Sequence, residues 1–89
     1  MSMKNPPHPG KSLQADLDAI GLNIPDGAKR LGLSHSTLQR LVDGETPITP
    51  AIAIRLEEAG WGVASFFVRL QAEYDLAQER LRIEASKGE

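Results

Sequence analysis

The stretch Ile24–Asp43, which reads IPDGAKRLGLSHSTLQRLVD, decides the fold. It predicts two short helices, because residues that start helices and residues that end them alternate along it. Asn23 and Ser34 are both good N-cap residues, and Gly32 is a good helix terminator. We therefore expect one helix that starts at Asn23 and stops at Gly32, and a second from about His35 to Asp43.

The pairing of these two helices favours a helix-turn-helix motif. Such a motif needs a small residue where its helices cross, which Ala28 provides, and a turn residue that tolerates positive φ, which Gly32 provides. Apolar side chains must also lock the helices together, and the sequence supplies Leu31, Leu33, Leu38 and Leu41. An ordinary helical hairpin shares some of these features, but the complete set in register favours a DNA-binding motif.

The second helix of the pair then carries the candidate site. Its Leu38 and Leu41 face the core, so its outward side chains are polar. Arg reads guanine and Gln reads adenine in the major groove, and amides at a helix N-terminus bind phosphate. For any one of these residues taken singly, solvated surface is the preferred explanation. The predicted DNA contacts are Ser34, His35, Ser36, Thr37, Gln39 and Arg40, with Thr46 in the following loop; Arg55 is either a backbone contact or solvated.

The rest of the chain predicts an all-α domain. Leu13, Leu17 and Ile20 recur at helical spacing over residues 11–20. Thr49 and Pro50 open another helix, which Gly60 ends, and a longer helix begins near Val63. No segment shows the alternation of a strand. We expect residues 1–9, with their prolines, to form an extended arm, residues 10–84 to form one domain, and residues 85–89 to form a frayed tail.

The long last helix carries a narrow apolar seam of coiled-coil type. Its members are spaced alternately three and four residues apart, and they are Phe67, Leu70, Tyr74, Ala77 and Leu81. For Phe67 and Leu70, packing inside the chain's own core is a serious alternative. For the seam as a whole we favour contact between two copies of the chain, so we predict a homodimer.

Composition excludes several function classes and leaves one difficulty. The 89 residues contain no cysteine and only two histidines, and no metal-ligand spacing or glycine-rich phosphate loop occurs. We therefore expect no enzyme, no cofactor and no metal, and we expect a cytoplasmic protein. The net charge of −2 is unusual for a DNA-binding protein. It is unevenly spread, with +1 over residues 24–55 and −3 over residues 56–89.

Four parts of the sequence resemble the HigA-type antitoxins, which belong to the XRE (Cro/C1-like) helix-turn-helix proteins. Residues 5–10 (NPPHPG) look like the family's opening motif, and residues 28–41 look like its helix-turn-helix. Residues 48–50 with 55–56 look like its fourth helix, and residues 70–76 look like its C-terminal signature. The two terminal motifs are the more specific ones.

This resemblance implies a lambda-repressor-like fold of five helices and a dimer that represses its own operon by binding operator DNA. It also implies a second partner, a HigB-type toxin that is a ribosome-dependent RNase. The sequence departs from the family at Gly27, where a large apolar residue is usual, and at Val63, where Ser or Thr commonly caps. Asp43 and Glu45 replace the usual Asn and Lys and would repel phosphate. Two alternatives stay open: a stand-alone regulator without a toxin, or a toxin-binding module with little DNA affinity, which the net charge, Asp43 and Glu45 favour.

Overall fold

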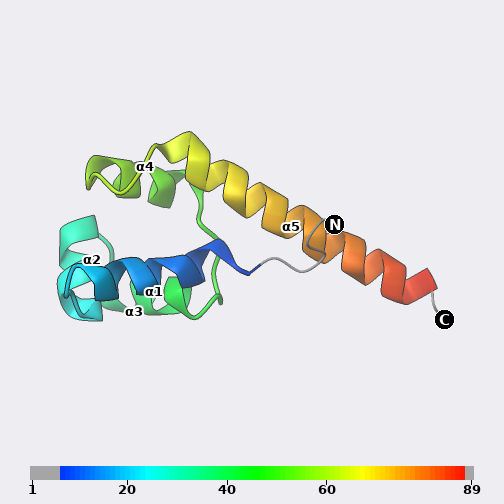
Figure 1. Cartoon of the computed structure of the whole chain (residues 1–89), viewed down its shortest axis with the longest axis horizontal. Coiled ribbons are helices and arrows are strands. Elements are labelled where there is room, and N and C mark those ends of the chain that lie inside the picture. The colour runs from blue at the N-terminus through cyan, green and yellow to red at the C-terminus, as the bar shows by residue number, and fades with distance from the viewer. Residues whose placement is uncertain (1–6, 88–89) are drawn as a thin grey trace.

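Five α-helices make up the structure, a computed structural model in which residues 7–87 are described (Figure 1). Residues 1–6 and 88–89, and with them most of the predicted arm and the end of the predicted tail, lie outside the described residues. No strand occurs between residues 7 and 87, as the sequence predicts. The helices are α1 (Pro9–Ala19), α2 (Ile24–Leu31), α3 (His35–Val42), α4 (Pro50–Glu58) and α5 (Ala64–Lys87).

Side-chain caps set the start of the first four helices. Asn23, Ser34 and Thr49 cap α2, α3 and α4 as predicted, each accepting a backbone N–H. The cap of α1 differs, because His8 Nδ1 accepts the Gly10 N–H at 2.8 Å. Helix α1 therefore begins at Pro9, so this residue is helical and the expectation that it lies in an extended arm is wrong.

The start of α5 is capped from another helix. Val63, at the position where Ser or Thr is common, cannot accept a hydrogen bond through its side chain. Instead, the Glu57 carboxylate in α4 accepts the Ala64 N–H at 3.0 Å. This bond fixes the turn between α4 and α5 and explains how the sequence tolerates Val63.

The core lies where α1, α2, α3 and α4 meet the first turns of α5. Leu13, Leu17, Leu38, Leu41 and Leu56 are its largest fully buried side chains. Gly27, which stands where a large apolar residue is usual, does not leave a void in this core. A β-carbon on Gly27 would stand 2.6 Å from Leu17 Cδ2 and 3.2 Å from Leu38 Cδ2. Leucines from α1 and α3 therefore fill the volume that a larger residue in α2 would occupy.

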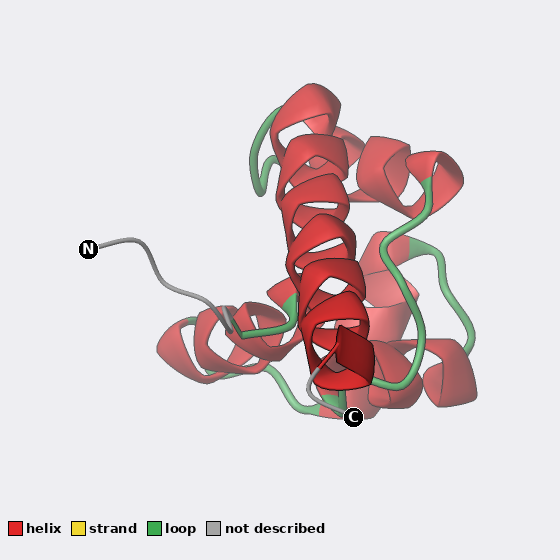
Figure 2. Cartoon of the chain, turned by 90° about the vertical axis from the view of Figure 1, so that its right-hand side faces the viewer, coloured by secondary structure: helices red, strands yellow, loops and turns green. Residues whose placement is uncertain are grey.

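Helix α5 extends well beyond the other helices (Figure 1). Its first half packs on α4 and α1, and its far end projects toward the viewer in Figure 2. The molecule accordingly measures 46 × 23 × 22 Å. Helix α5 continues to Lys87, so residues 85–87 of the predicted tail are helical.

Candidate nucleic-acid interface

The turn between α2 and α3 has the geometry that a helix-turn-helix requires. Gly32 adopts a left-handed conformation with φ of 69°. The next amide, of Leu33, donates to the Ala28 carbonyl at 2.9 Å, which satisfies an otherwise unpaired group at the end of α2. A β-carbon on Gly32 would stand 2.6 Å from Arg55 Nη1. Glycine is therefore favoured here by its backbone conformation, whereas the Arg55 guanidinium is the end of a flexible, exposed side chain and can move aside.

Helix α3 has one buried face and one polar face. Leu38, Leu41 and Val42 are buried, as the assignment of a core-facing side predicts. The exposed side chains on the opposite side are His35, Ser36, Gln39 and Arg40. We call these four residues, with Ser34 before them, the polar face of α3. All of them except Arg40 line one shallow depression on the surface.

Two of the predicted contact residues are occupied within the cap itself. Ser34 Oγ accepts the Thr37 N–H at 3.1 Å and donates to Thr37 Oγ1 at 2.7 Å. Ser36 Oγ lies 3.5 Å from the same Ser34 oxygen. Thr37 is partly buried, and its hydroxyl oxygen already accepts the hydrogen bond from Ser34 at the start of α3. Thr46, also partly buried, lies in the α3–α4 loop, apart from the residues that line the depression.

Asp43 acts on the polar face in a way that the sequence did not reveal. Gln39 Nε2 lies 3.2 Å from both carboxylate oxygens of Asp43, one helical turn further on. The sequence suggested only that this acid repels phosphate. The structure adds that its carboxylate holds the Gln39 amide nitrogen, which leaves the Gln39 oxygen as the free acceptor.

His8 and Gln71 are the buried polar side chains that the predicted site omitted. His8 is 7% exposed and packs edge-on against Tyr74, with ring centroids 4.9 Å apart. Burial lowers the pKa of His8; Lys11 lowers it further, and Asp75 opposes the shift. Gln71 Oε1 accepts the Ile48 N–H at 2.8 Å, and Gln71 Nε2 donates to Asp75 at 2.9 Å. A single Gln or His in a sequence carries little signal. Proline is common at the first position of a helix, so Pro9 after His8 could have indicated the start of α1, although we assigned it to the extended arm.

The predicted dimer seam of α5 divides into two parts. Phe67 is 6% exposed and belongs to the chain's own core, so its assignment to an intermolecular contact is wrong. Tyr74 also has a partner within the chain, because its ring packs edge-on against His8. The other seam residues are only partly buried in the single chain, and they are Leu70, Ala77 and Leu81. Their place in a dimer stays a prediction.

The described residues form neither a metal-binding cluster nor a membrane-spanning helix. Between residues 7 and 87, no three side chains among His, Cys, Asp and Glu come together where they could hold a metal ion. None of the helices in that range has both the length and the apolar character that crossing a membrane requires.

These observations define the chain as an all-α helix-turn-helix protein with a lambda-repressor-like fold. The same fold occurs in the Pseudomonas aeruginosa antitoxin HigA solved with the higBA promoter, with a TM-score of 0.84, 29% identity, and 92% and 90% of the two chains covered. A P. aeruginosa protein in complex with its operator DNA gives a TM-score of 0.78 and 32% identity, over 84% and 82%.

The sequence relationship goes further than the fold. The chain is 42% identical over 78 residues to virulence-associated protein A of Dichelobacter nodosus, a match that covers 85% of this chain and 76% of that protein. No protein-family model matches the chain. The chain belongs to the family of virulence-associated protein A.

Proposed function

We propose that this chain is a HigA-type antitoxin of the XRE family. As a cytoplasmic homodimer, it binds operator DNA, represses its own operon and neutralises a HigB-type RNase toxin. The polar face of α3 carries the proposal, because it is exposed, capped and built on a rigid turn. Two solved relatives of the same fold, at 29% and 32% identity, were captured with promoter or operator DNA. We expect no catalytic activity and no cofactor.

The polar face of α3 suits the major groove by its chemistry. Arg40 offers a bidentate donor for guanine, Gln39 offers an amide for adenine, and Ser34 lies where backbone amides meet phosphate. His35 and Ser36 lie at the N-terminal end of the helix, which enters the groove most deeply. A single domain with few Lys and Arg residues binds DNA weakly by itself. A dimer that engages two half-sites about 34 Å apart is therefore required for useful affinity.

A toxin-binding module with little DNA affinity is the second candidate. Asp43 favours it, because this acid stands at the end of the polar face and occupies Gln39. Glu45, which is exposed in the next loop, adds a second negative charge. This candidate predicts that Gln39→Ala and Arg40→Ala leave toxin neutralisation intact, and that the wild-type chain gives no footprint on its own promoter.

Co-expression with the product of the neighbouring reading frame tests the proposal. We expect that product to arrest growth by cleaving RNA, and we expect the chain to restore growth. Repression of a reporter behind the chain's own promoter is the second readout, and Arg40→Ala should weaken it while growth stays restored. A neighbouring frame without toxicity, combined with intact repression, would identify a stand-alone regulator instead.

A further inference from the structure

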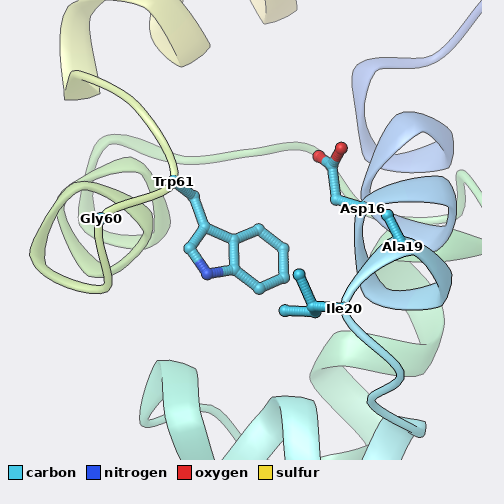
Figure 3. A pocket seen from close by; sticks show the side chains of 5 residues that line it. All are labelled: Asp16, Ala19, Ile20, Gly60 and Trp61. Carbon is cyan, nitrogen blue, oxygen red and sulfur yellow. The ribbon is translucent and has the colours of Figure 1, made fainter.

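A shallow slot opens between the C-terminal end of α1 and the loop that joins α4 to α5 (Figure 3). Its lining residues are Asp16, Ala19, Ile20, Gly60 and Trp61. The Trp61 indole points across the slot toward the Ile20 side chain, and the Asp16 carboxylate lies at the edge (Figure 3). Ile20 is 53% exposed although it is large and aliphatic. An aromatic ring and an aliphatic chain therefore form the two walls of a seat for an apolar side chain.

The two segments that build this slot are acidic. Residues 12–24 and 56–68 contain four carboxylates, of Asp16, Asp18, Glu57 and Glu58, and no Lys, Arg or His. All four of these residues are exposed, and Asp16 lines the slot itself. Asp18 accepts a hydrogen bond from Gln14, and Glu57 accepts the Ala64 N–H. Helices α1 and α4 also both end here, and helix C-termini carry partial negative charge. An apolar seat within a negative field is complementary to a basic surface that presents one apolar side chain.

We propose that this slot is the docking site for the toxin, which inserts an apolar side chain between Ile20 and Trp61 and places a basic residue against the Asp16 carboxylate at the edge. The inference rests on the proposed function, because the toxin is the protein partner which that function supplies. An RNase must bind a polyanion, so it needs a basic surface. An acidic seat attracts that surface and covers part of it.

The position of the slot allows toxin and DNA to be bound together. Its residues come from α1 and the α4–α5 loop, and none belongs to α2, α3 or the turn between them. These two segments hold four of the chain's twelve acidic residues and none of its Lys, Arg or His residues. Charge that would weaken DNA binding at α3 is thereby placed where a basic protein partner uses it.

The test measures binding of the purified neighbouring toxin to the full chain by calorimetry. Ile20→Ala should weaken binding about tenfold, because it removes one wall of the seat. Asp16→Asn should weaken binding about threefold and flatten its salt dependence. Ile54→Ala is the matched control, because Ile54 is 49% exposed on α4 and does not line the slot. Urea midpoints verify that each variant is folded.

Trp61 gives a direct readout of occupancy. It is the chain's single tryptophan, so incorporation of fluorotryptophan yields one fluorine NMR signal from the wall of the slot. Unlabelled toxin should shift that signal, and operator DNA alone should not. Unchanged toxin affinity in Ile20→Ala and Asp16→Asn, with an unshifted signal, would overturn the slot while the antitoxin function stands. Failure of the wild-type chain to bind the toxin would overturn the proposed function and the slot with it.

Discussion

At Gly10, the approach between two helices leaves no space for a side chain. A β-carbon there would stand 2.1 Å from the Leu41 carbonyl oxygen and 2.9 Å from its carbon. Backbone atoms cannot move aside as the end of a flexible side chain can. The start of α1 therefore lies directly against the end of α3, and the same residue follows the His8 cap. Gly10 belongs to the motif of residues 5–10 that resembles the family's opening motif, but the sequence does not reveal this contact.

Gly10→Ala should lower the free energy of unfolding by about 3 kcal/mol, because the clash is with backbone. Gly27→Ala is the matched control and should cost only about 1 kcal/mol, since the nearest atoms that it meets are methyl groups of the Leu17 and Leu38 side chains. Urea denaturation of both variants measures the difference. Equal or greater stability of Gly10→Ala than of wild type would show that α1 and α3 do not approach so closely.

A substitution of Asp43 should change the affinity for DNA and the selectivity for the operator in opposite directions. Asp43→Asn removes a negative charge at the end of the proposed DNA-binding face, so affinity for random DNA should rise about threefold. The amide holds Gln39 less firmly than the carboxylate does, so the ratio of operator to random binding should fall. Competition binding measures both quantities, with Glu84→Gln on α5 as the control for net charge. An unchanged ratio would mean that Asp43 does not position Gln39.

At the scale of the element, the helices follow from the sequence and their connections do not. Asn23, Ser34 and Thr49 cap where their residue types predict, because a cap depends on neighbours within three positions. The cap of α5 by Glu57 and the bond from Ile48 to Gln71 join residues 7 and 23 positions apart. Such contacts depend on how the helices pack against each other. The local sequence pattern does not encode that packing.

The bond between Gln71 and the α3–α4 loop should stabilise the fold measurably. Gln71→Ala leaves the buried Ile48 N–H without its partner, so the free energy of unfolding should fall by about 2 kcal/mol. Gln14→Ala is the control, because Gln14 is an exposed glutamine on α1 that bonds only to Asp18 on the surface. Its change should stay within about 0.5 kcal/mol. Equal losses in both variants would contradict the role given to Gln71.

The His8 cap should make stability depend on pH. The pKa of His8 is lowered in the folded state, mainly by burial. The unfolded chain therefore binds the proton more readily, and stability should fall as the pH drops through the ordinary value of 6.5. A protonated Nδ1 also cannot accept the Gly10 N–H. His8→Asn keeps a capping oxygen and should remove this part of the pH dependence; an identical profile in wild type and variant would exclude His8 as its source.

At the scale of the whole molecule, the polar face of α3 and the projecting half of α5 are separate surfaces that differ in charge. Residues 24–55 carry +1 and include the polar face of α3, whereas residues 56–89 carry −3. The projecting half of α5 leaves Leu81 only partly buried and Leu76 and Ile83 exposed.

The sequence predicted the five helices and the exposure of His35, Ser36, Gln39 and Arg40. It could not show that Phe67 belongs to the core, because a seam has the same spacing whichever partner it meets.

Dimerisation through α5 should be disrupted by Leu81→Asp, which places a charge in the seam. Sedimentation equilibrium should then give the monomer mass of 9.7 kDa, with the helical content of α5 retained. Ile83→Asp is the control, because Ile83 is 43% exposed and lies on another side of the helix. A dimer mass for Leu81→Asp would place the dimer contact elsewhere.

Fluorescence anisotropy against the chain's own upstream DNA, across a salt series, tests the central claim that α3 reads an operator. We expect selective binding over random DNA, weakening steeply with salt as phosphate contacts require. Arg40→Ala should cost about 2 kcal/mol and relax selectivity at one base pair. Wild-type binding no tighter than to random DNA, with no effect of Arg40→Ala, would contradict the account and leave the chain as a protein-binding module.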